Sequence, residues 1–228
     1  MPNVRHSRSK PTHLRATIVG CGAVSRWLVR PLLSYLHNHA HATSEVRFID
    51  GIGNKARRLA DDALTEFHTA VVSVVPEYLT EGNIADHIID DDFVFVCVDN
   101  CTSITLISGH AVKLRDITAM NGGCDWCDGI VQVHVRRQGK NLTPPFANKY
   151  HPEYISPRDR NPGDQLPSGL SPVASEPRCI VATNLTAAVM IAVFHRVRSG
   201  AFGKSLPEDG EYYLDSHRMR VVGRARTE

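Results

Sequence analysis

Two kinds of hydrophobic pattern alternate along the first half of the chain. Continuous apolar segments closed by turn residues predict strands, at 14–20, 45–50, 70–79 and 92–100. Apolar residues at helical spacing predict amphipathic helices at 25–37, 54–68 and 101–115, with a short helix capped by Thr80 before the fourth strand. That fourth strand is apolar throughout, so we expect both of its faces to be buried.

The resulting order of elements, βαβαβαβ, is typical of a Rossmann-like α/β fold with a doubly wound, mostly parallel sheet. Strands at 117–123 and 129–138 continue the pattern, and a hairpin at 211–216 and 219–226 predicts a C-terminal antiparallel extension. A buried helix at 179–200 precedes this hairpin. We therefore expect a polar tail at 1–13 and one nucleotide-binding domain at 14–228.

One long segment, at about 139–178, interrupts this regular pattern. It is rich in Pro, Gly, Ser and Asp, so it predicts neither regular helix nor central strand. Loops of this length are usually functional or mobile.

A glycine turn follows the first predicted strand, in the sequence "TIVGCGAVS". Gly20 and Gly22 let the backbone approach phosphate groups, and the following helix N-terminus stabilises their charge. Ala23 comes next, and Ser25 stands where a dinucleotide fingerprint has its third glycine. Plain turn chemistry is the alternative explanation of the two glycines.

Polar residues also follow the second and fourth strands, at the edge where a doubly wound sheet binds its ligand. Asp50 is placed to bind ribose hydroxyls, although it could instead cap the next turn. Lys55 begins the second helix and could contact phosphates, or could lie on a solvated charged face. Asp99 and Asn100 end the fourth strand, where they could hold Mg²⁺ of a nucleotide or form only a turn.

Composition narrows the class of protein. The chain has 228 residues, 42% hydrophobic and 22% charged, as in a soluble globular protein, and its net charge of +2 gives no case for nucleic acid or a membrane surface. We see no signal peptide, and the apolar runs fall short of the roughly 20 residues of a spanning helix. We therefore expect a cytoplasmic protein whose six cysteines are free thiols.

Four short motifs together resemble the ThiF/MoeB/E1-like family of ATP-dependent adenylyltransferases, which activate ubiquitin-like proteins and related carboxylates. They are "TIVGCGAVS", "RFID", "GNKARRLA" and "DFVFVCVDN", and the similarity extends over residues 14–200. In this family, 139–178 would be the crossover loop. The resemblance implies a homodimer that uses ATP and Mg²⁺ to convert the C-terminus of a ubiquitin-like protein, sulfur carrier or peptide into an acyl adenylate.

The resemblance also implies roles for particular residues. Asp50 would bind the ribose, Lys55 the phosphates, and Asp99 would hold Mg²⁺ near the site of attack. The full set of implied nucleotide contacts is Gly20, Gly22, Ala23, Ser25, Asp50, Asn54, Lys55, Arg58 and Asn100.

The link between Asp50 and Lys55 departs from the family pattern. The family has a longer loop there, with an "N..RQ" motif whose arginine helps to bind the phosphates. Here only residues 51–54 intervene, so either that loop is deleted or Asn54 and Arg57 supply the motif. The arginine that a partner subunit supplies in many members is unassigned.

The cysteines offer two further hypotheses. Cys124 and Cys127 form one CxxC pair, which supplies two of the four ligands of a structural zinc site, so we do not expect zinc. Cys179 lies at the end of the Pro-rich segment and at the start of the helix at 179–200, where it could form a thioester with the activated partner or be a buried helix-start residue.

Two alternatives to an active adenylyltransferase remain. An NAD(P)-dependent oxidoreductase would explain Gly20, Gly22 and Asp50, but it gives Lys55 and Asp99 no role. A catalytically weakened E1-like binding subunit would explain the short link.

Overall fold

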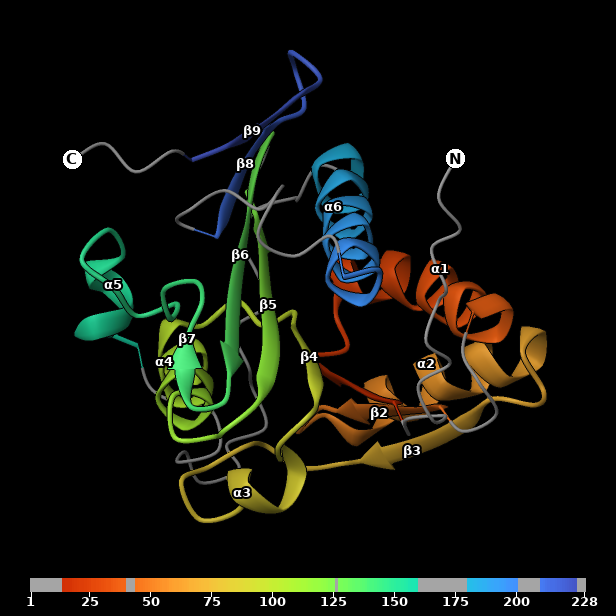
Figure 1. The fold of residues 1–228 in the computed structure, drawn as a ribbon. Coiled ribbons are helices and arrows are strands. Elements are labelled where there is room, and N and C mark those ends of the chain that lie inside the picture. The colour runs from red at the N-terminus through yellow and green to blue at the C-terminus, as the bar shows by residue number, and fades with distance from the viewer. Residues whose placement is uncertain (1–13, 40–43, 126, 160–179, 201–209, 225–228) are drawn as a thin grey trace, which may run out of the picture.

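The computed structural model describes residues 14–39, 44–125, 127–159, 180–200 and 210–224 (Figure 1). Their strands form one sheet in the order β3-β2-β1-β4-β5-β6-β8-β9, with β7 paired to β6. The strands are β1 (Leu14–Val19), β2 (Ser44–Ile49), β3 (Val71–Val75), β4 (Phe93–Val96), β5 (Ile117–Cys124), β6 (Asp128–Arg137), β7 (Lys140–Asn141), β8 (Glu211–Asp215) and β9 (Arg220–Gly223). The strands from β3 to β5 are parallel, and those from β6 onward pair antiparallel, as predicted.

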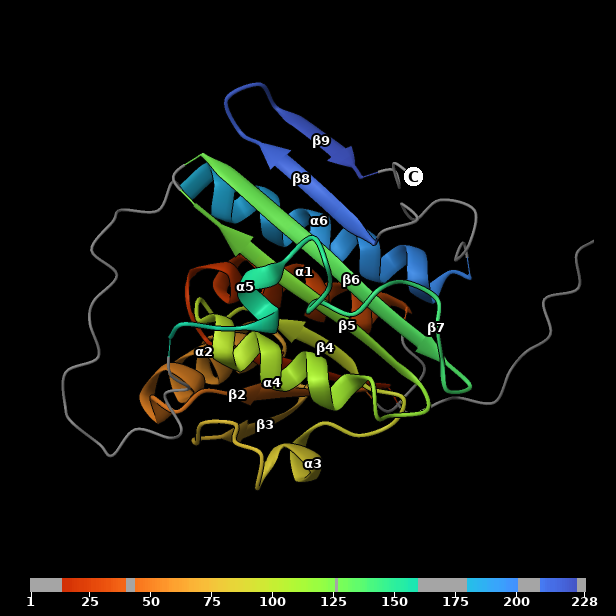
Figure 2. The same cartoon turned by 90° about the vertical axis from the view of Figure 1, so that its left-hand side faces the viewer.

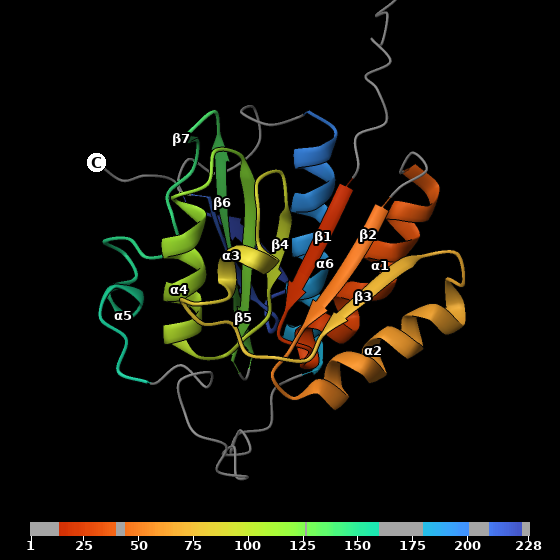
Figure 3. The same cartoon turned by 90° about the horizontal axis from the view of Figure 1, so that it is seen from below.

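Helices cover both faces of this sheet (Figures 1 and 3). On one face lie α1 (Ala23–His39), α2 (Gly53–Glu66) and α6 (Ile180–Arg198). On the other lie α3 (Ile84–His87), α4 (Cys101–Ala111) and α5 (Pro152–Ile155) (Figure 2). The Rossmann-like, doubly wound fold is therefore confirmed.

β4 shows why the chain folds in layers. Its alternate residues Phe93 and Phe95 pack against the ring of Phe194 in α6, with ring centroids 5.1 and 5.7 Å away. Val94 and Val96 belong instead to the core beneath α3 and α4. All four residues of β4 are buried, so the expectation of two covered faces is confirmed.

Several local predictions needed correction. Helix α1 begins at Ala23, two residues before the predicted start at residue 25, and it contains Pro31. Asn83 rather than Thr80 precedes the short helix α3, and the Thr80 N–H donates to the Asn83 side chain at 2.7 Å. The segment after residue 139 is not wholly irregular, because it contains the edge strand β7 and the single-turn helix α5.

Helix α6 also corrects the expectation that every apolar run falls short of the length of a membrane-spanning helix. It is the one helix among the described residues that is long and apolar enough to cross a membrane, by length and composition alone. In the structure half of that stretch is buried, against α1 and the sheet. The uninterrupted apolar runs in this part of the sequence are shorter than the helix, because Thr, Asn and His residues separate them and yet belong to the same helix.

Candidate functional site

The turn after β1 is shaped by its first glycine. Gly20 has a φ of 88°, and a Cβ at this position would lie 2.8 Å from the Cys97 carbonyl oxygen beyond β4. Its N–H donates to the Ile49 carbonyl of β2 at 2.9 Å. Only glycine tolerates both the left-handed backbone and this close approach, so the turn is held tightly between the ends of β2 and β4.

Asp50 joins this turn to the next one. Its Oδ2 accepts a hydrogen bond from the Cys21 N–H at 2.7 Å, and its Oδ1 accepts one from the Ile52 N–H at 2.8 Å. The carboxylate therefore fixes the glycine turn and the start of α2 relative to each other. Each oxygen keeps a second lone pair that a ribose hydroxyl could use.

The charged residues at the start of α2 lie next to this carboxylate. Burial, and then the negative charge of Asp50, raise the pKa of the Cys21 thiol to about 12, whereas the positive charge of Lys55 acts to lower it. Lys55 is thus close enough to influence the glycine turn. Lys55 and Arg58 are both exposed, and Asn54 is exposed beside them.

The short link from Asp50 to Lys55 is closely packed against the end of β3. A Cβ on Gly51 would lie 2.3 Å from the Tyr78 ring, and one on Gly53 would lie 2.8 Å from Cβ of Pro76. The Lys55 N–H donates to the Ile52 carbonyl at 2.8 Å, so the link turns directly into α2. The structure therefore agrees with a deleted loop, because residues 54–58 all belong to the helix.

The end of β4 supplies the third part of the candidate site. Asp99 is exposed there, and Asn100 caps α4 by accepting a hydrogen bond from the Ser103 N–H at 2.7 Å. Asp159 completes the cap, since its carboxylate accepts from the N–H groups of Cys101 at 2.6 Å and Thr102 at 3.0 Å. Sequence reasoning missed Asp159, which lies 58 residues after Cys101.

The remaining predicted residues differ in their accessibility. Gly22 has open space around it, and Ala23 is exposed at the first position of α1. Ser25 is fully buried and donates to the Gly22 carbonyl at 2.9 Å, so its hydroxyl supports the turn from beneath. Cys179 lies outside the described residues.

No cluster of three or more His, Cys, Asp or Glu side chains arranged to hold a metal occurs in the described part of the chain. A Mg²⁺ ion that arrives with a nucleotide needs only one or two carboxylates from the protein, because the phosphates and water supply its other ligands. Asp99 is the exposed carboxylate at the end of β4 that fits this role.

No protein-family model matches the chain, and no curated protein matches it. Solved structures do. MccB of E. coli in a complex with ATP superposes with a TM-score of 0.64 at 13% identity, over 93% of this chain and 63% of that one. MccB with AMPCPP and MccA gives 0.63 at 14% identity, over 94% and 65%. The chain has the fold of MccB.

A third structure, the microcin C7 biosynthetic enzyme MccB in complex with N-formylated MccA, gives a TM-score of 0.58 at 13% identity, over 94% of this chain and 66% of that one. The resemblance to the ThiF/MoeB/E1-like adenylyltransferases is thereby confirmed at the level of the fold. This chain spans slightly less than two thirds of the MccB chains with ATP and with AMPCPP.

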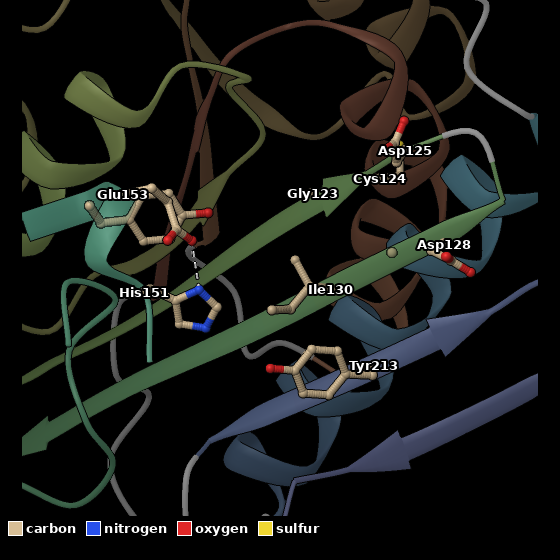
Figure 4. Close-up of a pocket in the computed structure, with 10 residues that line it drawn as sticks. Gly123, Cys124, Asp125, Asp128, Ile130, His151, Glu153 and Tyr213 are labelled. Carbon is tan, nitrogen blue, oxygen red and sulfur yellow. Dashed lines mark hydrogen bonds and ion pairs between the residues drawn. The ribbon is translucent and has the colours of Figure 1, made fainter. Parts of the chain in front are cut away.

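Sequence reasoning missed a buried ionic cluster on the α5 side of the sheet. Glu211 of β8 is 2% exposed and accepts hydrogen bonds from His151 at 2.8 Å, Tyr213 at 3.1 Å and Arg224 at 3.2 Å. His151 also bonds Glu153 at 2.9 Å through its other ring nitrogen (Figure 4). His151 and Glu211 are 60 residues apart, so no local motif could have paired them.

The protonation states in this cluster are coupled. Burial acts to raise the pKa of Glu211, but the bonds from His151, Arg224 and Tyr213 outweigh it and lower the pKa to about 2. Burial acts to lower the pKa of His151, but its bonds to Glu211 and Glu153 outweigh that effect and raise the pKa above its usual value. The pair is therefore an imidazolium and a carboxylate at slightly acidic pH.

Proposed function

We propose that the chain is an ATP-dependent adenylyltransferase that activates the C-terminal carboxylate of a peptide or small carrier protein. The observation that carries this proposal is the joining of the glycine turn and the start of α2 by Asp50, beside Lys55 and the end of β4. The fold of MccB, which has been crystallised with ATP and with MccA, supports it.

The residues divide the binding of ATP between them. The turn at Gly20 and Gly22, with the N-terminus of α1, would face the phosphates, and Lys55 would add a positive charge. Asp50 would accept hydrogen bonds from the ribose. Asp99 would bind the Mg²⁺ that accompanies the phosphates.

The reaction is a displacement at the α-phosphate. The acceptor carboxylate attacks this phosphorus, the bond to the bridging oxygen breaks, and an acyl adenylate and pyrophosphate result. The chain would accelerate it by aligning the two substrates and by placing positive charge where negative charge develops. We expect the active form to be a homodimer in the cytoplasm.

Ligand-induced thermal stabilisation tests the nucleotide assignment. ATP with Mg²⁺ should raise the melting temperature, and the Lys55→Ala variant should weaken ATP binding at least about tenfold, the effect of losing about 1.4 kcal/mol. Lys113→Ala is the matched control, because Lys113 is exposed just beyond the C-terminal end of α4. Stabilisation by NAD⁺ and not by ATP would support the oxidoreductase alternative.

Pyrophosphate exchange tests the chemistry. With peptides that end in Gly-Gly, exchange of labelled pyrophosphate into ATP should be lost in Lys55→Ala and Asp99→Ala and retained in Lys113→Ala and Asp62→Ala. Asp62 is exposed in the middle of α2, away from the helix start. ATP binding without exchange would favour the weakened binding subunit, and active Lys55 and Asp99 variants would show that the site is misplaced.

A further inference from the structure

Residues 142–159 are hydrogen-bonded to α4 at successive points along that helix (Figure 2). The Ser108 hydroxyl accepts a hydrogen bond from the Ala147 N–H at 3.1 Å, and the Thr105 hydroxyl donates one to the Tyr154 carbonyl at 2.7 Å. Helix positions three apart are neighbours on one face, so these two bonds lie on the same side of α4. The segment therefore follows α4 toward its N-terminus.

Asp159 extends this contact to the first turn of α4. Its carboxylate accepts hydrogen bonds from the N–H groups of Cys101 at 2.6 Å and Thr102 at 3.0 Å, and its carbonyl accepts one from the Thr102 hydroxyl at 2.7 Å. Asn100 accepts a hydrogen bond from the Ser103 N–H at 2.7 Å. The first three N–H groups of α4, which have no acceptor within the helix, are therefore held by these two side chains.

The turn that Asp159 holds also carries the proposed Mg²⁺ ligand Asp99. Before Asp99, the Cys97 N–H donates to the Val19 carbonyl of β1 at 2.8 Å, which fixes the end of β4. Two residues after Asp99, the Cys101 N–H donates to Asp159. Asp99 thus lies between two fixed points of the backbone, and the direction of its carboxylate depends on both of them.

The helix N-termini at this edge of the sheet differ in charge. The first turns of α1, residues 23–26, and of α2, residues 53–56, contain no carboxylate, and Lys55 adds a positive charge to α2. At α4, Asp159 supplies a carboxylate to the helix and Asp99 supplies another just before it. A helix N-terminus stabilises negative charge, so α1 and α2 suit phosphates, whereas at α4 the protein itself supplies the anion. The end of β4 therefore suits a cation better than a phosphate.

We propose that Asp159 is a positioning residue for the Mg²⁺ of bound ATP. By holding the first turn of α4, it fixes the backbone that carries Asp99 at the end of β4. The bonds of Thr105 and Ser108 hold the segment that leads to Asp159. This inference rests on the proposed function, since it takes Asp99 to bind the Mg²⁺ that accompanies ATP.

The Mg²⁺ dependence of ATP binding tests this role. The ATP-induced rise in melting temperature is measured at fixed ATP and increasing Mg²⁺. The Mg²⁺ concentration that gives half of the maximal rise should increase about fivefold in Asp159→Ala, the effect of losing a helix cap. The maximal rise itself should be retained, because the proposed role involves no contact between Asp159 and the nucleotide.

Asp90→Ala is the matched control. Asp90 is exposed like Asp159, and its carboxylate accepts hydrogen bonds from two consecutive N–H groups, those of Arg115 at 2.7 Å and Asp116 at 3.0 Å. These contacts lie before β4 and β5, at the opposite edge of the sheet from Asp99. Asp90→Ala should therefore leave the half-maximal Mg²⁺ concentration unchanged.

A double-mutant cycle with Asp99 separates positioning from a general loss of stability. Asp99→Asn should itself raise the half-maximal Mg²⁺ concentration, and Asp159→Ala should then add nothing further, because it acts through Asp99. Hydrogen–deuterium exchange of the nucleotide-free protein gives a second readout, since residues 97–103 should exchange faster in Asp159→Ala and not in Asp90→Ala.

Four results would overturn the proposal: an unchanged half-maximal Mg²⁺ concentration in Asp159→Ala, an equal change in Asp90→Ala, an additive effect in the cycle, or unchanged exchange of residues 97–103. Failure of the proposed function would appear separately, as the absence of any ATP-induced stabilisation in the wild type. That result would remove the inference as well.

Discussion

Replacement of Glu211 by glutamine should destabilise the protein substantially, although the two side chains have nearly the same shape. The Glu211 carboxylate is 2% exposed and accepts hydrogen bonds from His151, Tyr213 and Arg224. Lowering its pKa from 4.5 to about 2 corresponds to about 3 kcal/mol of stability at neutral pH. Removal of one member of a buried ion pair has a similar cost, because the other charge is left without compensation.

The loss should depend on pH in a defined way. Glu211 has a lowered pKa, so its contribution is present above pH 4.5 and is lost as the pH falls toward about 2. His151 has a raised pKa, so its contribution is present below pH 6.5 and is lost as the pH rises through the raised value. The difference between wild type and Glu211→Gln should therefore be largest from about pH 4.5 to 6.5.

Urea unfolding followed by tryptophan fluorescence at pH 3, 5.5 and 9 measures this difference. The control is Glu66→Gln, which breaks an exposed ion pair with Arg30. The Arg30 side chain is 76% exposed and the Glu66 side chain is 43% exposed. Such surface pairs contribute about 0 to 1 kcal/mol. A Glu211→Gln effect no larger than that of the control, or equal at all three pH values, would refute the assignment of an ionic pair.

Two further substitutions test the opposite ends of the parallel strands by the same unfolding measurement. Gly20 follows β1 at the candidate nucleotide site, whereas Asp92 precedes β4 at the other edge of the sheet. Gly20→Ala should lower the free energy of unfolding by at least about 2 kcal/mol and abolish ATP-induced stabilisation, because φ is 88° and a Cβ would lie 2.8 Å from backbone oxygen. Gly109→Ala is the control, because Gly109 lies in open space on α4, and this substitution should stabilise the protein by roughly 0.5–1 kcal/mol. Equal changes in the free energy of unfolding for Gly20→Ala and Gly109→Ala would contradict the strained-turn account. Asp92→Asn should cost about 3 kcal/mol, because Asp92 is 2% exposed and pairs with Arg15 through two 2.6 Å hydrogen bonds; a cost below about 1 kcal/mol would contradict it.

The parallel half of the fold was predictable because its signals are local. A buried strand, a turn and an amphipathic helix repeat along the chain, and each strand brings its polar end to the same edge of the sheet. Asp50 is the clearest case, since the strand-end rule placed it near the glycine turn and the structure shows the bond to the Cys21 N–H.

The C-terminal half was less predictable, because its interactions join distant segments. His151 lies in a stretch rich in Pro and Gly, yet its partner Glu211 lies in the last hairpin. Asp159 caps α4 although it lies 58 residues after Cys101, and Asn100, which the sequence placed at the end of the fourth strand, was not predicted to be the other cap. Such pairs follow from how the strands are ordered, which periodicity alone does not specify.

The shortened link from Asp50 to Lys55 changes how phosphate charge would be balanced. Gly51 and Gly53 pack against Tyr78 and Pro76 too closely to admit a side chain, so the link has a specific shape and is not merely a truncated loop. Because Asp50 also bonds the Ile52 N–H, the first turn of α2 is fixed relative to the glycine turn. In the proposed ATP complex, the positive charge that the resemblance assigns to an arginine of a longer loop would come instead from this turn of α2, where Lys55 follows the link directly.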